Sequence, residues 1–206
     1  NLLIVAGKIN NQESSDDEEK EQIDLMHNYI EKYNLYEHIR WLEGDADRKR
    51  VPEFYRVIGD TKGVFVQPAS FEGFGLTVIE AMRSGLPTFA TQYGGPLEII
   101  EDEKCGFHID PADDKDTEIK LVAFFSRCKT DKNYWEKISK AGIKRVDTTF
   151  NWELYAKNLL SLAKIYGFWK FTSNIEMTEM NSYLDLMYHT LYKPRAKEIF
   201  EGWERT

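Results

Sequence analysis

Cysteine is scarce in this sequence of 206 residues: only Cys105 and Cys128 occur, and they form no CxxC pair. Two isolated thiols suit neither a disulfide framework nor a zinc site, so we expect both to be reduced. Asn-x-Ser/Thr sequons are absent, and no apolar run approaches the ~20 residues of a membrane span. These absences favour a cytoplasmic location without membrane association.

Positive charge is the second shortage. Lys and Arg total 27 against 35 Asp and Glu, which gives a net charge of −8. An acidic chain repels phosphate backbones and anionic lipid, so neither nucleic acid nor membrane is an expected partner. A nucleotide can still bind, because backbone dipoles act locally whatever the net charge. The four histidines fit no metal or catalytic-triad spacing, and no metal site is expected: His27, His38, His108 and His189.

The apolar content, 42% of the residues, is sufficient for a packed core, and the length fits one domain. The run Leu2–Ala6 predicts a buried parallel strand. Since the sequence starts abruptly inside this strand, we expect a fragment of a longer protein. A helix with an inward apolar stripe should follow; the stripe consists of Ile23, Met26, Ile30 and Tyr33.

Short strands and helices then alternate along the chain. We expect strands over 39–42, 63–66, 88–90 and 106–109, and helices after Pro52, over 76–83 and over 97–100. Alternation at this spacing predicts the α/β class, with a Rossmann-like parallel sheet, flanking helices and right-handed crossovers.

The remainder of the chain is expected to be helical. Four apolar faces are predicted: Leu121, Phe124, Phe125 and Cys128; Trp135, Ile138 and Gly142; Trp152, Tyr155, Leu159, Leu162 and Tyr166; and Met177, Met180, Leu184, Met187 and Leu191, ending before Pro194. The methionine-rich face indicates core packing rather than a cofactor site.

The stretch from Pro68 to Met82 combines a glycine-containing loop with two carboxylates. A strand is expected to end at Val66 and a helix to begin near Gly75, so the loop follows the carboxyl end of a strand, where open α/β sheets bind ligands. The first N–H groups of the helix lack intrahelical partners and carry partial positive charge. Gly73 and Gly75 let the backbone approach a ligand closely. The loop therefore predicts a phosphate site on backbone amides.

Glu72 and Glu80 bracket the start of this helix, with seven residues between them. Each carboxylate can accept two hydroxyl hydrogen bonds, which matches the vicinal diol of a hexose or a ribose. Glu72 can face a sugar beyond the phosphate, whereas Glu80 lies farther back, beside a nucleoside. The alternative is structural: one glutamate complements the helix dipole and the other faces solvent. On spacing alone, the structural alternative is favoured.

The pair Glu72-x7-Glu80 around Phe74-Gly75-Leu76 resembles the Glu-x7-Glu motif of the retaining GT-B glycosyltransferases. The stretch 89–100 is similar to the strand and glycine turn that follow this motif in the sucrose-metabolising members. Further stretches resemble the sucrose synthase family in particular: Tyr55-Arg56, 60–63, 65–69, 85–91, 106–111 and 166–170. The likeness runs from Leu2 to about Ala196.

The resemblance implies a role for each matched residue of the loop. Glu72 would be the catalytic residue that holds hydroxyls of the transferred glucosyl group. Phe74 and Gly75 would offer backbone contacts to this sugar. Leu76 and Thr77 would donate N–H groups to the diphosphate of the nucleotide sugar.

The resemblance also implies how the nucleoside is held. Glu80 would bind the ribose hydroxyls, and the segment 43–51 would meet the base. Asp45 and Val51 stand where the family usually has glutamine and asparagine, so backbone contact at Asp45 can persist while the side-chain contact at Val51 is lost. In the family, the Arg and Lys that clamp the diphosphate lie upstream of Asn1.

The resemblance implies a division of the chain near residue 165. Residues 1–165 would form the C-terminal nucleotide-sugar-binding domain of a GT-B enzyme, without its first strand and helix, and residues 166–206 a helical extension. The implied reaction is reversible and retaining: NDP-glucose and D-fructose give NDP and sucrose, without a metal or other cofactor. The implied ligands are UDP or ADP, UDP-glucose or ADP-glucose, fructose and sucrose. The implied protein partners are the N-terminal GT-B domain and further copies of the chain in a homotetramer.

Two alternatives remain open. A sucrose-phosphate synthase, or another retaining GT-B glycosyltransferase, would use the same motif. An isolated nucleotide-binding fragment without activity would keep the loop but lack the acceptor domain.

Overall fold

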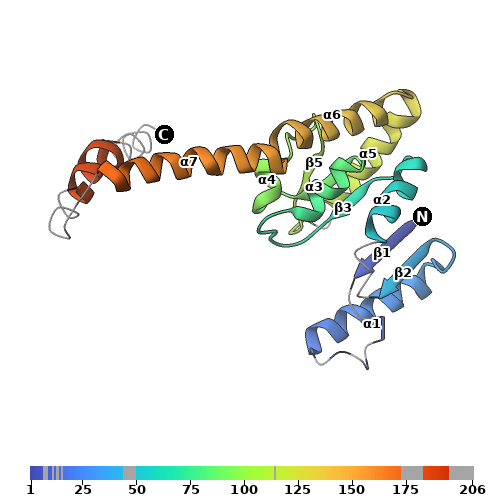
Figure 1. Ribbon diagram of the computed structural model, residues 1–206. Helices are drawn as coiled ribbons and strands as arrows, with labels where there is room; N and C mark the ends of the chain where they lie inside the picture. The colour runs from blue at the N-terminus through green and yellow to red at the C-terminus, as the bar shows by residue number, and fades with distance from the viewer. Residues whose placement is uncertain are drawn as a thin grey trace, which may run out of the picture. The chain divides into compact units, whose positions relative to one another are not determined.

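The computed structural model describes residues 1–6, 9, 10, 12, 14, 16–43, 50–113, 115–172 and 183–194. The chain forms two compact units, Asn1–Asn151 and Trp152–Thr206. The elements follow one another as shown in Figure 1: β1 (Leu2–Ala6), α1 (Asp17–Lys32), β2 (Ile39–Glu43), α2 (Val51–Asp60), β3 (Phe65–Gln67), α3 (Leu76–Arg83), β4 (Thr88–Thr91), α4 (Gly95–Ile99), β5 (Phe107–Ile109), α5 (Asp116–Thr130), α6 (Tyr134–Thr149), α7 (Trp152–Thr172) and the π-helical turn η2 (Tyr188–Tyr192). The predicted domain boundary at residue 165 falls inside α7.

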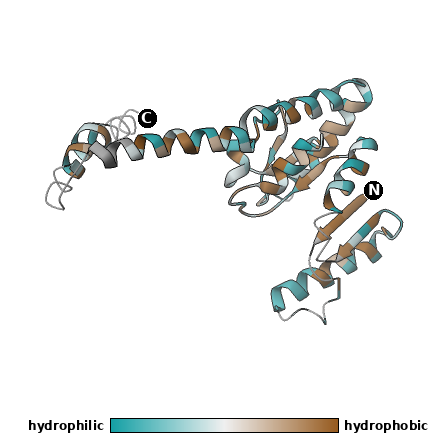
Figure 2. Cartoon of the chain, in the orientation of Figure 1, coloured by the Kyte–Doolittle hydropathy of each residue, from teal (hydrophilic) through white to brown (hydrophobic). Residues whose placement is uncertain are grey.

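The strands of the first unit form two parallel sheets. β1 pairs with β2, in the register Leu2↔Ile39 to Ala6↔Glu43. The second sheet has the order β3-β4-β5 and is also parallel. Helices connect the successive strands, which confirms the predicted α/β class. The strands are mainly apolar, whereas the helices carry polar residues on their outer faces (Figure 2).

Local sequence signals set the helix boundaries. Asp16 caps α1 by accepting the N–H of Glu18, and three acidic residues occupy its first turn, where they complement the helix dipole. Pro52 lies in the first turn of α2, where its missing N–H costs no helical hydrogen bond. The predicted bounds of α3, Leu76 to Arg83, are confirmed.

The core surrounds β4, all four residues of which are buried. The Phe89 ring stacks on Phe107 with centroids 4.6 Å apart, and the Phe124 ring meets Phe89 edge-on at 5.5 Å. Met82 and Ile138 from the covering helices are also fully buried. Because β4 is covered on both faces, the positions of the neighbouring strands β3 and β5 are fixed. The edge of the sheet at the carboxyl ends of these strands is therefore fixed as well.

Two residues that were predicted to lie on buried apolar faces are exposed in the structure. Tyr33 is 58% exposed, although Ile23 and Ile30 of the same stripe are buried, because α1 ends at Lys32 and Tyr33 is its C-cap. Phe125 is exposed, whereas Phe124 fills the core. Adjacent helical residues point about 100° apart, so only one of two neighbouring phenylalanines can face the sheet.

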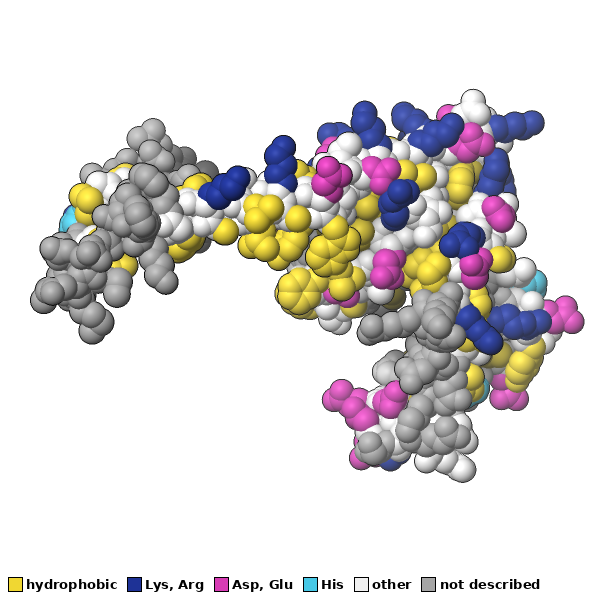
Figure 3. All heavy atoms as spheres, viewed as in Figure 1, with side chains coloured by type: hydrophobic (Ala, Val, Ile, Leu, Met, Phe, Trp, Pro, Cys, Tyr) yellow, Lys and Arg dark blue, Asp and Glu magenta, His cyan; other side chains and the backbone are white. Residues whose placement is uncertain are grey.

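The second unit is helical where it is described. The predicted apolar face of α7 is exposed, with Trp152 at 84%, and Figure 3 shows apolar side chains along this helix. Met177 and Met180 lie outside the described residues. The predicted helix end before Pro194 is wrong, since Lys193 and Pro194 are still helical after η2. A proline in a helix lacks its own N–H, and its ring crowds the carbonyl one turn before it. Here that preceding turn is the π-type turn η2, which differs from an α-helix in its hydrogen bonds.

Both cysteines are free thiols, Cys105 buried and Cys128 half-buried. No helix in the described part of the chain is long and apolar enough to cross a membrane.

Candidate nucleotide-sugar site

The candidate site is the loop that joins β3 to α3. β3 ends at Gln67, and α3 begins at Leu76. Gly75 is the N-cap residue of α3 and has a φ of 76°, a left-handed conformation that side-chain-bearing residues rarely adopt. A Cβ at this position would lie 2.7 Å from Cδ1 of Ile99. Glycine is therefore required here both by the backbone conformation and by the contact with α4.

The carboxylate of Glu72 accepts hydrogen bonds from its own loop and from the end of β3. Oε1 accepts hydrogen bonds from the N–H groups of Phe74 (3.2 Å) and Gly75 (3.0 Å). Oε2 accepts one from Nε2 of Gln67, at 2.7 Å. The carboxylate thus lies at the N-terminus of α3, as the structural alternative requires, and it occupies the two N–H groups that the resemblance assigns to the sugar. A sugar hydroxyl in this site would contact a carboxylate that is already held in place.

Two further backbone N–H groups belong to the start of α3. Leu76 and Thr77 are the first residues of α3, so their N–H groups have no acceptor within the helix. The side chain of Leu76 is 67% exposed and that of Phe74 83% exposed, which leaves the helix N-terminus open. The positive end of the helix dipole therefore faces a surface where an anion can bind.

A glycine turn from β4 into α4 holds the backbone of Glu72. The N–H of Glu72 donates to the carbonyl of Tyr93 (3.1 Å), and the N–H of Gly95 donates to the carbonyl of Glu72 (2.8 Å). A Cβ on Gly94 would lie 2.0 Å from this carbonyl oxygen, and Gly94 has a φ of 102°. The close approach of the two loops thus depends on the absence of a side chain at Gly94.

Glu80 lies one helical turn into α3 and is exposed. Its carboxylate is close enough to Tyr55 of α2 to affect the phenol. Burial raises the pKa of Tyr55 to about 12, and the negative charge of Glu80 adds to this rise. Tyr55 packs with Ala81 and Leu86, so α2 is fixed against α3 beside Glu80.

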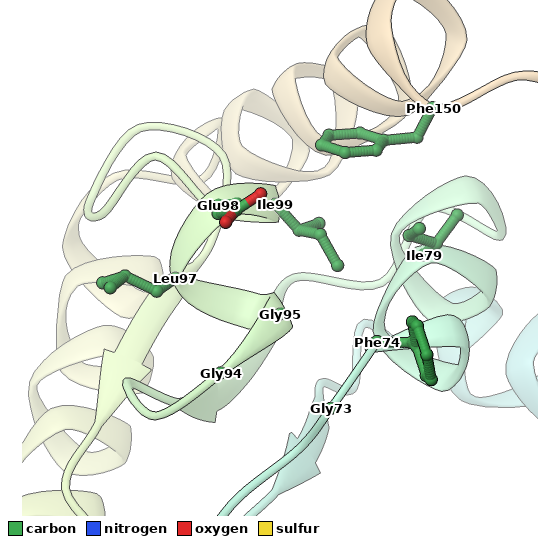
Figure 4. A pocket seen from close by; sticks show the side chains of 9 residues that line it. All are labelled: Gly73, Phe74, Ile79, Gly94, Gly95, Leu97, Glu98, Ile99 and Phe150. Carbon is green, nitrogen blue, oxygen red and sulfur yellow. The ribbon is translucent and has the colours of Figure 1, made fainter. Parts of the chain in front are cut away.

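A pocket of about 460 Å³ lies beside the loop, between α3, α4 and the end of α6. It is lined by Gly73, Phe74, Ile79, Gly94, Gly95, Leu97, Glu98, Ile99 and Phe150. Figure 4 shows the side chains of Ile79, Ile99 and Phe150 pointing toward one another across this space. The two glycine-containing segments form its rim with exposed backbone. Such a combination of apolar walls and backbone polar groups is typical of small-molecule sites.

The structure brings most of the predicted residues together on this one loop and helix: Glu72, Phe74, Gly75, Leu76, Thr77 and Glu80. Asp45 lies outside the described residues. Two features of the site were not predicted from the sequence: Gln67 as the hydrogen-bond donor to Glu72, and the docking of Gly94 on Glu72. A polar residue that ends an apolar strand was the available signal for Gln67. In the described residues no three His, Cys, Asp or Glu side chains gather as metal ligands would.

Comparison with known proteins agrees with this geometry. The family model described as "Glycosyl transferases group 1" matches residues 1–145. The chain therefore belongs to the group 1 glycosyl transferases. A solved sucrose-phosphate synthase from Thermosynechococcus elongatus is similar to it, with 26% sequence identity, a TM-score of 0.60, and coverage of 83% of this chain and 39% of that one.

The curated relatives narrow the resemblance to sucrose synthases. The chain is 56% identical to the sucrose synthase of Melioribacter roseus over 98% of its own length and 25% of that protein. It is 48% identical to the sucrose synthase of Nitrosomonas europaea over 97% of its own length and 25% of that protein. The resemblance predicted from the sequence is thus confirmed. The chain spans about a quarter of the length of these relatives.

Proposed function

We propose that this chain forms the nucleotide-sugar-binding part of a sucrose synthase, which transfers a glucosyl group reversibly between a nucleoside diphosphate and fructose. The observation that carries this proposal is the β3–α3 loop, where a fixed carboxylate lies next to an open helix N-terminus. These are the two groups that a sugar diphosphate needs, one for its hydroxyls and one for its phosphates. Sucrose synthases 48–56% identical to the chain support the same assignment.

In sucrose cleavage, the bond between the anomeric carbon of glucose and the fructose oxygen breaks, and a diphosphate oxygen bonds to that carbon. The departing fructose oxygen takes up a proton. In the reverse direction the diphosphate leaves with negative charge, which the N–H groups of Leu76 and Thr77 would stabilise. These dipoles are fixed in the fold before the reaction, so they cost no reorganisation. The proposal requires no metal or other cofactor in this part of the protein.

Nucleotide binding by this fold finds support in a solved structure. HepE from Anabaena, crystallised with UDP and glucose, shares the fold, with a TM-score of 0.57 and 21% identity over 77% of this chain and 40% of that one. We propose UDP-glucose or ADP-glucose as the donor, placed with its diphosphate at the N-terminus of α3. The ribose would then lie near Glu80. α2, which packs beside Glu80, directly follows the segment 43–51 predicted to meet the base.

Glu80→Ala tests the nucleoside end of this arrangement. We expect UDP and ADP to bind the full-length protein about tenfold or more weakly, because a hydrogen bond to a charged group contributes roughly 1.5–3 kcal/mol. Both nucleotides should lose the same factor, since they share the ribose. Calorimetric titration measures the affinities. Unchanged affinity would return Glu80 to the role of a solvent-facing helix residue.

Gln67→Met tests the support of the catalytic carboxylate. Methionine keeps the length of the side chain but removes the donor to Oε2 of Glu72. We expect sucrose cleavage to fall about threefold to tenfold, with UDP affinity unchanged, because one hydrogen bond to a charged group is lost. In a Glu72→Gln background the same change should have a much smaller effect, since the two residues act through one contact. Additive losses in the double variant would show that Gln67 acts elsewhere.

A further inference from the structure

A second cavity, of about 390 Å³, lies at the opposite end of β3 from the Glu72 loop. Its wall includes Lys62 from the turn before β3, Phe125 and Lys129 from α5, and Lys132 and Trp135 from the connection to α6 and its first turn. The indole N–H of Trp135 donates to the carbonyl of Gly63 at 2.9 Å, which fixes this ring against the turn. The stretch 60–63, one of those that resemble sucrose synthases, thus lies away from the nucleotide-sugar site.

Lys62 has an unfavourable backbone conformation for a lysine. Its φ is 56°, in the left-handed region, where glycine or asparagine is usual. The position is set by the end of α2: the N–H of Lys62 donates to the carbonyl of Gly59 (2.9 Å), and that of Gly63 to the carbonyl of Ile58 (2.8 Å). A glycine would meet this requirement without strain. Strained residues of this kind cluster at ligand-binding positions, and the side chain of Lys62 lines the cavity.

The lining combines positive charge with aromatic rings. Within the described part of the chain, Lys62 forms one ion pair, a long one with Glu136 at 3.7 Å. Over the described residues, neither Lys129 nor Lys132 forms an ion pair. Lys and Arg side chains gather over α5 and α6 on the face shown in Figure 3. The exposed Phe125 ring and the half-buried Trp135 ring provide the apolar part of the wall.

Two acidic residues, Asp131 and Glu136, are sequence neighbours of Lys132 and Trp135 and balance part of the positive charge of the three lysines. Glu136 is shared between Lys62 and Lys140. Asp131 accepts a hydrogen bond from the N–H of Asn133 at 3.0 Å, which stabilises the turn before α6. The half-buried thiol of Cys128 also lines the cavity. Burial raises its pKa, Asp131 adds to the rise, and the nearby Lys62 charge opposes it.

We propose that this cavity binds a small sugar phosphate, a phosphate monoester whose dianion contacts Lys62, Lys129 and Lys132 and whose carbon skeleton packs on Phe125 and Trp135. The volume is within the range of small-molecule sites and exceeds what inorganic phosphate alone would fill. The lysine charges suit a dianion, and aromatic faces suit the C–H groups of a sugar ring. The site is separate from the donor site, so it does not depend on the function proposed above.

The test is calorimetric titration of the full-length protein with glucose 6-phosphate at low salt and saturating UDP. We expect glucose 6-phosphate to bind about tenfold or more tightly than inorganic phosphate or glucose. Its affinity should fall as the salt concentration is raised. Lys62→Gly should weaken binding about tenfold or more, because one charged contact is lost. Its melting temperature should stay the same or rise, because glycine relieves the left-handed strain.

Glu103→Gly is the matched control. Glu103 has a φ of 59° and does not line the cavity, so its replacement relieves the same kind of strain and should leave binding unchanged. Lys129→Met provides a second variant, at a position without backbone strain, and should also weaken binding. In addition, bound sugar phosphate should slow the alkylation of Cys128, while Cys105 is buried and unreactive throughout.

Several outcomes would overturn the proposal. If glucose 6-phosphate does not bind, or if UDP displaces it, there is no separate site for a sugar phosphate. Equal affinity for inorganic phosphate would show that the aromatic wall plays no part and that sugar phosphates are the wrong class. Normal binding by both Lys62→Gly and Lys129→Met would show that the ligand lies elsewhere.

Discussion

Sucrose cleavage by the full-length protein should fall about tenfold to a hundredfold or more in Glu72→Gln, while UDP affinity stays nearly unchanged. The carboxylate would contact hydroxyls of the glucosyl group, which UDP lacks, so only steps that involve the sugar are affected. The loss corresponds to roughly 1.5–3 kcal/mol of transition-state stabilisation. Steady-state kinetics and a UDP titration on the same variant measure both quantities.

The structure explains why glutamine is the suitable replacement. Its carbonyl oxygen can still accept the N–H groups of Phe74 and Gly75, as Oε1 of Glu72 does. Its amide can donate to Gln67, because the Gln67 side chain can turn its own oxygen toward it. Gln67 Oε1 is buried and has no hydrogen-bond partner, so it is available for this exchange. The loop is therefore expected to keep its shape, and the variant to lose only the negative charge.

A purely structural Glu72 would give the opposite pattern. Loss of a charge that complements the helix dipole costs about 0.3–1 kcal/mol of stability and leaves turnover near normal. A lowered melting temperature with normal turnover would therefore contradict the proposed role in sugar binding. A parallel loss of UDP affinity would instead show that the loop had been displaced.

Gly94→Ala should be the most destabilising single change at the site, by about 2–5 kcal/mol. The new Cβ would lie 2.0 Å from the carbonyl oxygen of Glu72, and a φ of 102° is accessible essentially to glycine alone. Relief would require the glycine turn to move away from Glu72 and break the hydrogen bond from Gly95. Sucrose cleavage should therefore be lost together with stability. Thermal melting and activity of the full-length protein provide the measurements.

Gly73→Ala is the control for this change, in the same loop. A Cβ at Gly73 meets no atom within 4 Å, so the effect on stability should stay within about 0.5 kcal/mol. If Gly94→Ala melts at the same temperature as Gly73→Ala, the glycine turn does not approach Glu72 as closely as described.

The sequence by itself determined the local elements of the site. The apolar strand before Gln67, the glycines of the loop and the apolar period after Gly75 are short-range signals, and they gave α3 its correct bounds. The seven-residue spacing of Glu72 and Glu80 placed one at the helix start and the other a turn along it. The alternation of strands and helices likewise determined the α/β class, because a helix between two strands carries the chain back across the sheet and makes the strands parallel.

Only the tertiary structure decided which groups meet. Gly94 is distant in sequence from Glu72, and no local pattern states that one supports the other; parallel pairing of β3 and β4 brings them to the same edge. Gln67 donates to Glu72 because the loop folds back over the strand end. Lys62 and Trp135 share a cavity because α6 packs beside the turn before β3. The periodicity of a sequence shows which face of an element is apolar, but which neighbour covers that face, and which polar groups are thereby brought together, depends on long-range packing.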